Sequence, residues 1–261
     1  MFKLKSLIAS TVLVLSMFAS TIAQADQLAT VMERGVLKVA VPQDFPPFGS
    51  VGSDLQPQGY DIDMASYLAK ELGVKLELVP VTSANRIPYL QTRKVDLVIS
   101  SLGKNAEREK AIDFSDAYAP FFLGVFGAEE IKVASAAELA GKTIGVTRGA
   151  VEDIELSKLV DESTTIKRFE DNNTTLSAYL SGQVELIATG NLVATEIAKR
   201  VPTRKPAAKF MLKNSPCYVG VLKGEEALVA KVNDLIAKAK SDGDLEKLSL
   251  AWFKTSLPAG L

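Results

Sequence analysis

The stretch "YDIDMASYLAKELGVKLELVPV", residues 60–81, contains a helix pattern followed at once by a strand pattern. Residues 60–73 favour a helix with Asp61 as its N-cap and Gly73 as its C-terminal stop. Residues 74–81 form a short run typical of a strand. A helix joined so closely to a strand indicates an α/β fold.

The same pattern recurs on both sides of this stretch. Strand-like runs at 36–41 and 95–100, with a short helix within 86–94, complete a βαβαβ unit. A second unit follows Gly141, with strands expected at 142–147, 165–170 and 184–189, and helices from about residue 151, over 174–181 and over 192–200. Apolar strands alternating with amphipathic helices predict mainly parallel sheets covered on both faces.

Two extended segments separate these units from each other and from the tail. Residues 116–127 and 213–224 contain aromatic residues and are punctuated by Gly and Pro, unlike a Gly/Ser linker. The tail, two predicted helices at 225–243 and 244–253, is too small to form a domain. We therefore expect residues 26–118 and 221–261 to form one lobe and 125–213 a second. Two hinge crossings, at 119–124 and 214–220, would join the lobes beside a cleft.

The first 25 residues have the features of a secretion signal. Lys3 and Lys5 precede an apolar core, and Ala23-Gln24-Ala25 fits a signal peptidase site. The only cysteine is Cys217, so none is placed to carry a lipid anchor after cleavage. The sequence predicts an exported, soluble protein of the periplasm, starting at Asp26.

Composition excludes several classes of function. The 30 basic and 31 acidic residues nearly balance, which does not favour binding to nucleic acid or anionic membranes. A lone cysteine forms no internal disulfide, and the apolar run around Cys217 predicts a buried small hydrophobe. With no histidine, Ser-His-Asp, Cys-His and histidine metal sites are excluded. We expect a monomer without a metal or cofactor.

The segment "SSLGKNAERE", residues 100–109, follows an apolar strand with small and hydroxyl-bearing residues and then an arginine. Ser100, Ser101 and Gly103 offer donors at the strand end, and the Arg108 guanidinium matches a planar carboxylate. This pattern predicts a loop that holds an anion. The alternative is a surface arginine paired with Glu107 or Glu109.

Two further segments are candidates for the same site. "TRGAVED", 147–153, passes through Gly149 into a helix N-terminus, which favours an anion, although an ordinary turn would have the same sequence. "QDFPPF", 43–48, holds Phe45 on a loop stiffened by proline. Arg86 is either a second ligand contact or a solvated helix residue. Asp61 and Asp63 are expected to be cap and first-turn charges rather than ligand contacts.

Six stretches resemble, in order, the periplasmic solute-binding proteins of the polar amino acid ABC-importer type. They are "LKVAVPQDFPPF", "QGYDIDMASYLAKELGVKLELVPV", "NRIPYLQTRKVDLVISSL", residues 107–118, "LAGKTIGVTRGAVED" and "LSGQVELIATGN". The resemblance implies a two-lobed periplasmic-binding-protein fold that catches a small carboxylate-bearing solute between its lobes. It also implies a membrane permease as partner.

The resemblance implies roles for individual residues. Arg108 would clamp the ligand carboxylate, with Ser100, Ser101 and the backbone of Gly103, which replaces the usual Ser or Thr. Phe45 would be the stacking platform. The loop from the second lobe would close over the carboxylate through four residues: Arg148, Gly149, Ala150 and Val151.

Two questions follow from departures from the family pattern. Gly190, followed by Asn191, stands where the family has an aspartate that pairs with the ligand ammonium. Either another acid, such as Asp44 or Glu152, takes that role, with Asn191 as a ligand contact, or the solute is not an α-amino acid. Some relatives resemble periplasmic dehydratases of cyclohexadienyl acids, which need a carboxyl group of raised pKa in a closed cleft. Asp44 and Glu152 are the nearest candidates for that chemistry.

Overall fold

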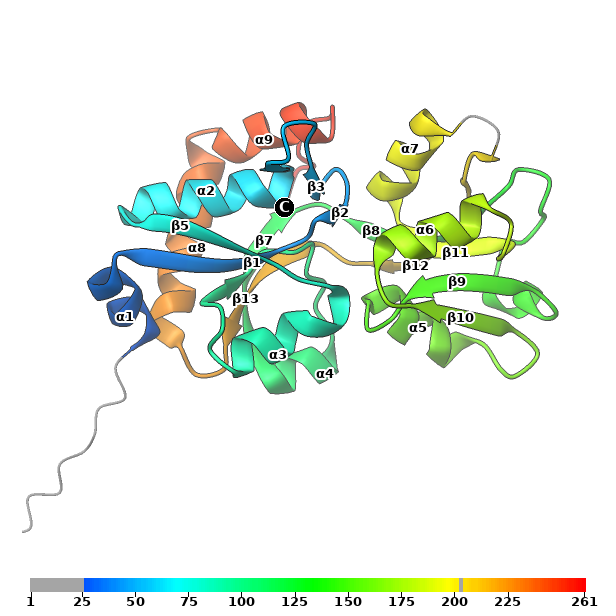
Figure 1. Cartoon of the computed structure of the whole chain (residues 1–261), viewed down its shortest axis with the longest axis horizontal. Helices are drawn as coiled ribbons and strands as arrows, with labels where there is room; N and C mark the ends of the chain where they lie inside the picture. Colours follow the sequence, from blue (N-terminus) through cyan, green and yellow to red (C-terminus); the bar gives the residue numbers. More distant parts are fainter. Residues whose placement is uncertain (1–25, 202–203) are drawn as a thin grey trace, which may run out of the picture.

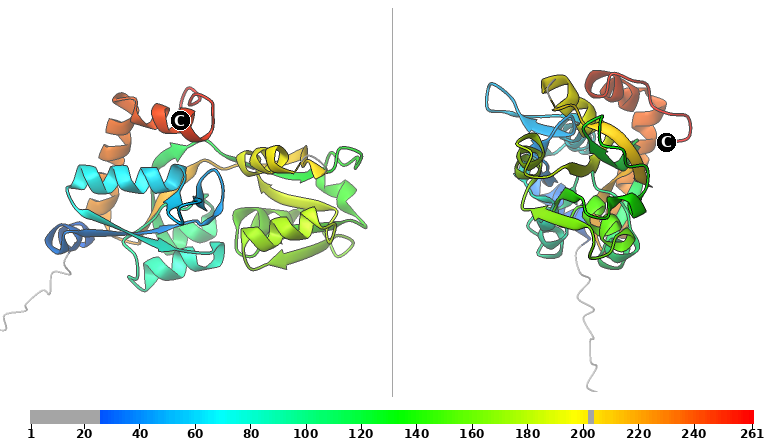
Figure 2. Two further views of the ribbon diagram at one scale, coloured as in Figure 1. Left: turned by 45° about the horizontal axis from the view of Figure 1, so that its top comes forward. Right: turned by 90° about the vertical axis from the view of Figure 1, so that its right-hand side faces the viewer.

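The computed structural model describes residues 26–201 and 204–261 and contains two lobes, each built around a five-stranded sheet (Figure 1). The predicted signal peptide at residues 1–25 lies outside the described residues. The views of Figure 2 show the two lobes lying side by side along the long axis, with the C-terminus on the first lobe.

Lobe 1 contains the strands predicted around residues 36–100 together with two that arrive later in the chain. Its sheet has the order β5 (Lys75–Pro80), β1 (Val36–Val41), β6 (Leu97–Val98), β13 (Cys217–Leu222), β7 (Ile112–Ala119). One face is covered by α1 (Gln27–Arg34), α2 (Tyr60–Leu72), α8 (Glu226–Ser241) and α9 (Asp244–Trp252). The other is covered by α3 (Arg86–Gln91) and α4 (Ala106–Ala111), with the 3-10 turn η1 (Ser83–Asn85) preceding α3.

Lobe 2 repeats this arrangement. Its sheet has the order β10 (Thr165–Phe169), β9 (Thr143–Thr147), β11 (Leu186–Gly190), β8 (Phe122–Gly127), β12 (Ala207–Asn214). One face carries α5 (Val151–Leu159) and the 3-10 turn η2 (Ala136–Leu139). The other carries α6 (Asn172–Leu180) and α7 (Asn191–Arg200).

The two sheets are mixed, and the reason lies in how the chain moves between them. In each sheet three neighbouring strands are parallel, and the strands nearest the crossings pair antiparallel with their neighbours. The chain passes between sheets at residues 120–121 and 215–216, inside the segments predicted as crossings. The predicted α/β fold is confirmed, with antiparallel strands added where the chain returns.

The start of α2 differs from the prediction. Gly59, with φ 143°, is the N-cap residue, and Asp61 lies inside the first turn with its side chain fully buried. Asp61 is therefore not a cap. Asp63 does lie in the first turn, and its carboxylate accepts a hydrogen bond from Trp252 Nε1 at 2.7 Å, which ties the C-terminal helix to α2.

A small sheet of β2 (Asp44–Phe45), β3 (Gly49–Val51) and β4 (Pro57–Gln58) sits on lobe 1 at the edge facing lobe 2 (Figure 1). Its aromatic residues pack with others from distant segments. The ring centroids of Phe48 and Phe121 lie 4.9 Å apart, and Tyr60 stacks on Phe253 with 4.4 Å between the ring centroids. The first crossing and the C-terminal helix are thus fixed by one aromatic cluster.

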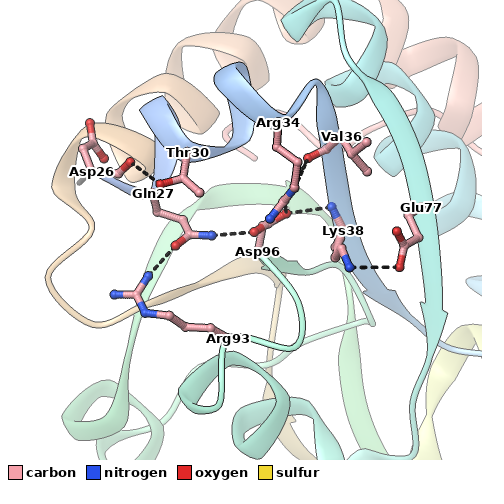
Figure 3. Close-up of polar contacts among 9 residues, drawn as sticks. All are labelled: Asp26, Gln27, Thr30, Arg34, Val36, Lys38, Glu77, Arg93 and Asp96. Carbon is pink, nitrogen blue, oxygen red and sulfur yellow. Dashed lines mark hydrogen bonds and ion pairs between the residues drawn. The ribbon is translucent and has the colours of Figure 1, made fainter. Parts of the chain in front are cut away.

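A polar cluster fixes α1 to lobe 1 (Figure 3). Buried Asp96 accepts hydrogen bonds from the Gln27 amide, the Arg34 guanidinium and the Lys38 backbone N–H. Arg93 donates to the Gln27 side chain and, at 2.9 Å, to Glu225. One carboxylate thus satisfies donors from a helix and a strand.

We expect Asp96→Ala to destabilise the protein by about 3 kcal/mol, because it leaves buried donors without an acceptor. The thermal midpoint should fall by roughly 6–12 °C for a protein of this size. Glu77→Ala is the control, since the Lys38–Glu77 pair is half-exposed and worth less than about 1 kcal/mol. Thermal unfolding followed by circular dichroism measures both, and equal midpoints would contradict the assigned role of Asp96.

Candidate functional site

Part of the loop predicted to hold an anion, Ser101 and Gly103, lines a small cavity between the lobes. Its lobe 1 walls are Phe45, Ser83, Arg86, Ser101 and Gly103. Its walls from the crossings and lobe 2 are Phe121, Leu123, Ala150, Val151, Glu152, Asn172 and Ser215. The space left between them is only about 10 Å³, smaller than any amino acid. With the lobes in this arrangement, the space is too small for an amino acid.

The carboxylate of Asp61, in α2, fixes the loop at the end of β6. The Asp61 carboxylate accepts hydrogen bonds from the Ser101 N–H and from the Tyr118 hydroxyl, both at 2.6 Å. Ser101 has φ 41°, a left-handed conformation that a non-glycine residue adopts only when its surroundings impose it. Burial raises the pKa of Asp61 to about 7 despite these hydrogen bonds and the nearby Arg86. Asp61 is a positioning residue that sequence reasoning missed, because its partners are far away in sequence.

Arg86 is a buried cation at the cavity wall. Its side chain is 5% exposed, and its Nε donates to Ser100 Oγ at 3.1 Å. Burial lowers its pKa, while Glu152, Asp61 and Asp44 oppose that shift. No carboxylate forms an ion pair with it within the described part of the chain. Of its two predicted roles, the solvated helix residue is excluded by this burial.

Arg108 lies behind the cavity wall and joins the two lobes. Its Nη1 donates to the Gly103 carbonyl at 2.7 Å, and its Nη2 donates to the Gly149 carbonyl of lobe 2 at 3.0 Å. It is 5% exposed, and burial together with the neighbouring Arg86 lowers its pKa to about 10. The alternative of surface pairing is excluded, because Glu107 pairs with Lys110 and Glu109 with Lys104.

The loop from lobe 2 faces these arginines with its backbone and one acid. Gly149 adopts φ 73°, its N–H donates to Asp153, and its carbonyl receives the Arg108 bond. Ala150 and Val151 line the cavity, as does Glu152 in the first turn of α5. Burial raises the pKa of Glu152, although Arg86 and Arg108 lower it.

Ser215, in the second crossing, supplies a hydroxyl beside Gly103. A Cβ at position 103 would lie 2.4 Å from Ser215 Oγ, so the absence of a side chain at 103 makes room for this hydroxyl. Ser215 Oγ is buried and lacks a hydrogen-bond partner among the described residues. The sequence predicted Gly103 as a site residue but not Ser215, because the two are more than a hundred positions apart in the chain.

Five predicted site residues do not line the cavity: Ser100, Arg108 and Gly149 are hydrogen-bonded to each other or to residues that line it, whereas Arg148 and Asn191 lie away from it. Arg148 is half-exposed and pairs with Glu170 at 2.9 Å, while Asn191 accepts a hydrogen bond from the Phe122 N–H at 3.2 Å. Position 190 is closed by an aromatic ring, since a Cβ on Gly190 would meet Phe121 Cζ at 1.7 Å. Any acid at this position would require Phe121 to move.

A groove of about 420 Å³ adjoins the cavity and shares Phe45 and Asn172 with it. Its lobe 2 wall is largely apolar, with Leu176, Ile187 and Val193. Beside it, Asp44 of lobe 1 accepts hydrogen bonds from Asn172 N at 2.7 Å, Asn172 Nδ2 at 3.0 Å and Asn173 N at 3.3 Å. Asp44 thus caps a helix of the opposite lobe and joins the lobes at the cleft mouth.

Within residues 26–201 and 204–261, no group of three or more acidic, histidine or cysteine side chains is placed to hold a metal ion. No helix in this part of the chain is long and apolar enough to cross a membrane. Cys217 is buried, as predicted, and burial raises the pKa of its thiol.

Comparisons with known proteins agree with this architecture. Residues 37–255 match the family described as bacterial extracellular solute-binding proteins, family 3. The chain is 30% identical to the L-cystine-binding protein TcyJ of Escherichia coli (strain K12) over 92% of this chain and 91% of that protein. The solute receptor for L-cysteine of Neisseria gonorrhoeae superposes with a TM-score of 0.81 at 31% identity, covering 86% of this chain and 92% of that one.

An ancestral protein is similar to a comparable degree. AncCDT-1, described as an ancestral amino acid-binding protein and a precursor of cyclohexadienyl dehydratase, is 32% identical, with a TM-score of 0.80. The superposition covers 88% of this chain and 100% of AncCDT-1.

Asp61→Asn should change how stability depends on pH. Because burial raises the folded-state pKa of Asp61 to about 7, its contribution to stability is present at pH 4 and is lost as the pH rises through 7. The asparagine variant lacks this loss. Its free energy of unfolding relative to wild type should therefore rise between pH 4 and 8, by at most on the order of 4 kcal/mol.

Urea unfolding of both proteins across this pH range measures the difference, in which all other titrating groups cancel. Asp63→Asn, in the same helix turn, is the control and should give parallel curves. Parallel curves for Asp61→Asn as well would mean that the Asp61 carboxyl is not held protonated by burial.

Proposed function

The chain belongs to the bacterial extracellular solute-binding proteins of family 3, and we propose that it is the amino-acid-binding component of an ABC importer. Membership confirms the predicted family and the prediction of a binding protein rather than an enzyme. The relatives named for cystine, cysteine and amino acid binding support the amino acid as ligand class. The exported location is supported by the extracellular family and by the predicted signal sequence.

The observation that carries the proposal is a pair of buried guanidinium groups without a carboxylate partner. Arg86 and Arg108 are each 5% exposed and have only neutral acceptors within hydrogen-bond distance: Ser100 Oγ and two backbone carbonyls. A buried cation without a counter-ion is costly, and a ligand carboxylate between the lobes would offset that cost. Arg86 lines the cavity and has the fork geometry that binds a carboxylate through two hydrogen bonds, while Arg108, bound to two carbonyls, adds positive charge from behind the wall.

The adjoining groove gives the ligand side chain a place to extend. A solute held by its carboxylate at Arg86 would pass between Phe45 and Asn172, which line both spaces, and reach the apolar wall of Leu176 and Val193. A volume of about 420 Å³ accommodates a side chain larger than that of the small amino acids. L-cystine, for which the similar Escherichia coli protein is named, has such a long side chain and is therefore the first solute to test.

The dehydratase alternative has less support. The two candidate acids for that chemistry are Asp44 and Glu152. The Asp44 carboxylate accepts hydrogen bonds at the N-terminus of α6, so that of the two only Glu152 lines the cavity. The similar protein linked by its description to that chemistry is itself an amino acid-binding protein. A periplasmic monomer that delivers its solute to a membrane permease is the arrangement we propose.

Closure of the lobes is the proposed signal to the permease. Lobe 1, residues 26–118 and 221–261, would move relative to lobe 2, residues 125–213, about the crossings. Hydrogen bonds of Asp44, Arg108 and Lys213 join the lobes, and lobe 2 side chains such as Val193 share an apolar cluster with lobe 1. A ligand that adds contacts to both lobes stabilises the closed state.

Arg86→Met and Arg108→Met should each weaken binding of the best solute in a panel of L-cystine, L-cysteine, L-glutamine and L-arginine. Losing a charge-assisted contact in a desolvated cleft predicts a loss of about 30-fold to a few thousand-fold in affinity. The ligand-free variants should melt no lower than wild type, because a buried unpaired cation has been removed. Calorimetry and thermal shift measure the two effects.

Arg93→Met is the matched control, since Arg93 contacts Gln27 and Glu225, neither of which lines the cavity. It should lower the melting temperature and leave affinity unchanged. Binding by both cavity-side variants within twofold of wild type would overturn the proposed carboxylate site.

Asp44→Ala should open the ligand-free protein, because it removes three hydrogen bonds between the lobes. Small-angle scattering is expected to show a larger radius of gyration than for wild type without ligand, and affinity should fall about tenfold. Asp171→Ala removes the cap of the same helix from within lobe 2 and is the control. An unchanged radius for Asp44→Ala, with or without ligand, would count against a hinge at the crossings.

A further inference from the structure

Glu152 is a buried carboxylate that the protein leaves unpaired. It lines the cavity from the first turn of α5 and is 5% exposed. Its carboxylate is hydrogen-bonded by its own backbone and lies in the field of Arg86 and Arg108, but among the described residues no Lys or Arg nitrogen lies within 4.0 Å of it and no other residue donates a hydrogen bond to it. A buried anion in this state is costly unless a cation joins it.

The other acids near the cleft already have partners. Asp44 accepts three hydrogen bonds from the start of α6, and Asp61 accepts two from Ser101 and Tyr118. Asp153 binds the Gly149 N–H and the Arg168 guanidinium. Of the four, Glu152 alone faces the cavity without a neighbour to bind.

Ser215 gives an independent indication of a polar ligand group at the same place. Its hydroxyl is buried, has no hydrogen-bond partner among the described residues and lines the same cavity from the second crossing. A hydroxyl oxygen accepts hydrogen bonds as well as donating them. Together, Ser215 and Glu152 offer acceptors to one cationic group.

The charges of the site fit such a group. Arg86 and Arg108 place two cations around the cavity, so an ammonium entering without an acid would add a third positive charge to a desolvated space. With Glu152 ionised, a ligand that carries one carboxylate and one ammonium adds one anion and one cation to the charges of Arg86, Arg108 and Glu152. A ligand with a carboxylate alone would leave Glu152 beside a second anion.

We propose that Glu152, with the Ser215 hydroxyl as a second acceptor, binds the ammonium group of the ligand, which makes the ligand an amino acid in zwitterionic form. This inference rests on the proposed function, because it assumes a carboxylate held by Arg86 and Arg108. Position 190, closed by the Phe121 ring, plays no part in this recognition.

The test compares each amino acid with its deaminated analogue by calorimetry. The pairs are L-cystine with dithiodipropionic acid, L-glutamine with glutaramic acid and L-arginine with guanidinovaleric acid. Wild type should prefer the amino acid by about 30-fold or more in the pair that it binds best. In Glu152→Gln the preference should fall at least about tenfold, in Glu152→Asp less, and in Ser215→Ala about threefold.

Glu162→Gln, an exposed residue after α5, is the control and should keep the wild-type preference. Glu152→Gln should fold with an unchanged or higher melting temperature, because it removes a buried unpaired carboxylate. If it does not fold, the comparison rests on Glu152→Asp and Ser215→Ala.

The outcomes separate this inference from the function beneath it. If Glu152→Gln keeps the wild-type preference for the amino acid, Glu152 does not bind the ammonium, and the carboxylate site stands. If Glu152→Gln does not fold, an unchanged preference in both Glu152→Asp and Ser215→Ala leads to the same conclusion. Wild type that binds the deaminated analogues as tightly as the amino acids also overturns the role of Glu152. Failure to bind any standard amino acid, or cystine, overturns the proposed function itself.

Discussion

The burial of two guanidinium groups between the lobes is the constraint on which the rest of the site depends. Arg86 and Arg108 have been taken out of water and given neutral oxygens in place of carboxylates. Neutral acceptors recover only part of the lost hydration. The remaining cost falls when an anion enters, so the ligand-free site favours binding of a carboxylate. A salt bridge within the protein would have removed this preference, and the carboxylates of Asp44 and Asp61 instead accept hydrogen bonds from backbone N–H groups and a tyrosine hydroxyl.

The same arginines link recognition to closure. Arg108 binds one carbonyl from each lobe, so its position is defined only when the lobes are close together. Asp44 makes a second link by capping a helix of the opposite lobe. Beside these hydrogen bonds, Val151, Val193 and Ile197 of lobe 2 belong to the same apolar cluster as the core of lobe 1. A ligand that touches both lobes adds to these contacts and so favours the closed state.

The fold could be predicted from sequence because its signals are local. The helix at 60–73, the strand at 36–41 and the extended crossings follow from periodicity and from Gly and Pro positions that need no knowledge of distant residues. The lobe 1 side of the site was equally accessible, since Ser101, Gly103 and Arg108 are close in sequence. The role of Asp61 was not, because a helix N-cap and a buried acceptor for Ser101 look alike until the β6 loop is placed against α2. Arg148 and Asn191 were placed by register alone, and their side chains instead meet Glu170 and the Phe122 N–H.

Two glycines show why register alone is insufficient to assign the ligand contacts. At position 103 the missing side chain leaves space for Ser215, and at position 190 it leaves space for the Phe121 ring. In both cases a residue from a crossing segment fills the volume that a side chain on the lobe would have taken. A hydroxyl is therefore retained at the first position, whereas an acid is excluded at the second. Because the Phe121 ring occupies that volume, the acid that we propose for a ligand ammonium is one on another wall of the same cavity, Glu152.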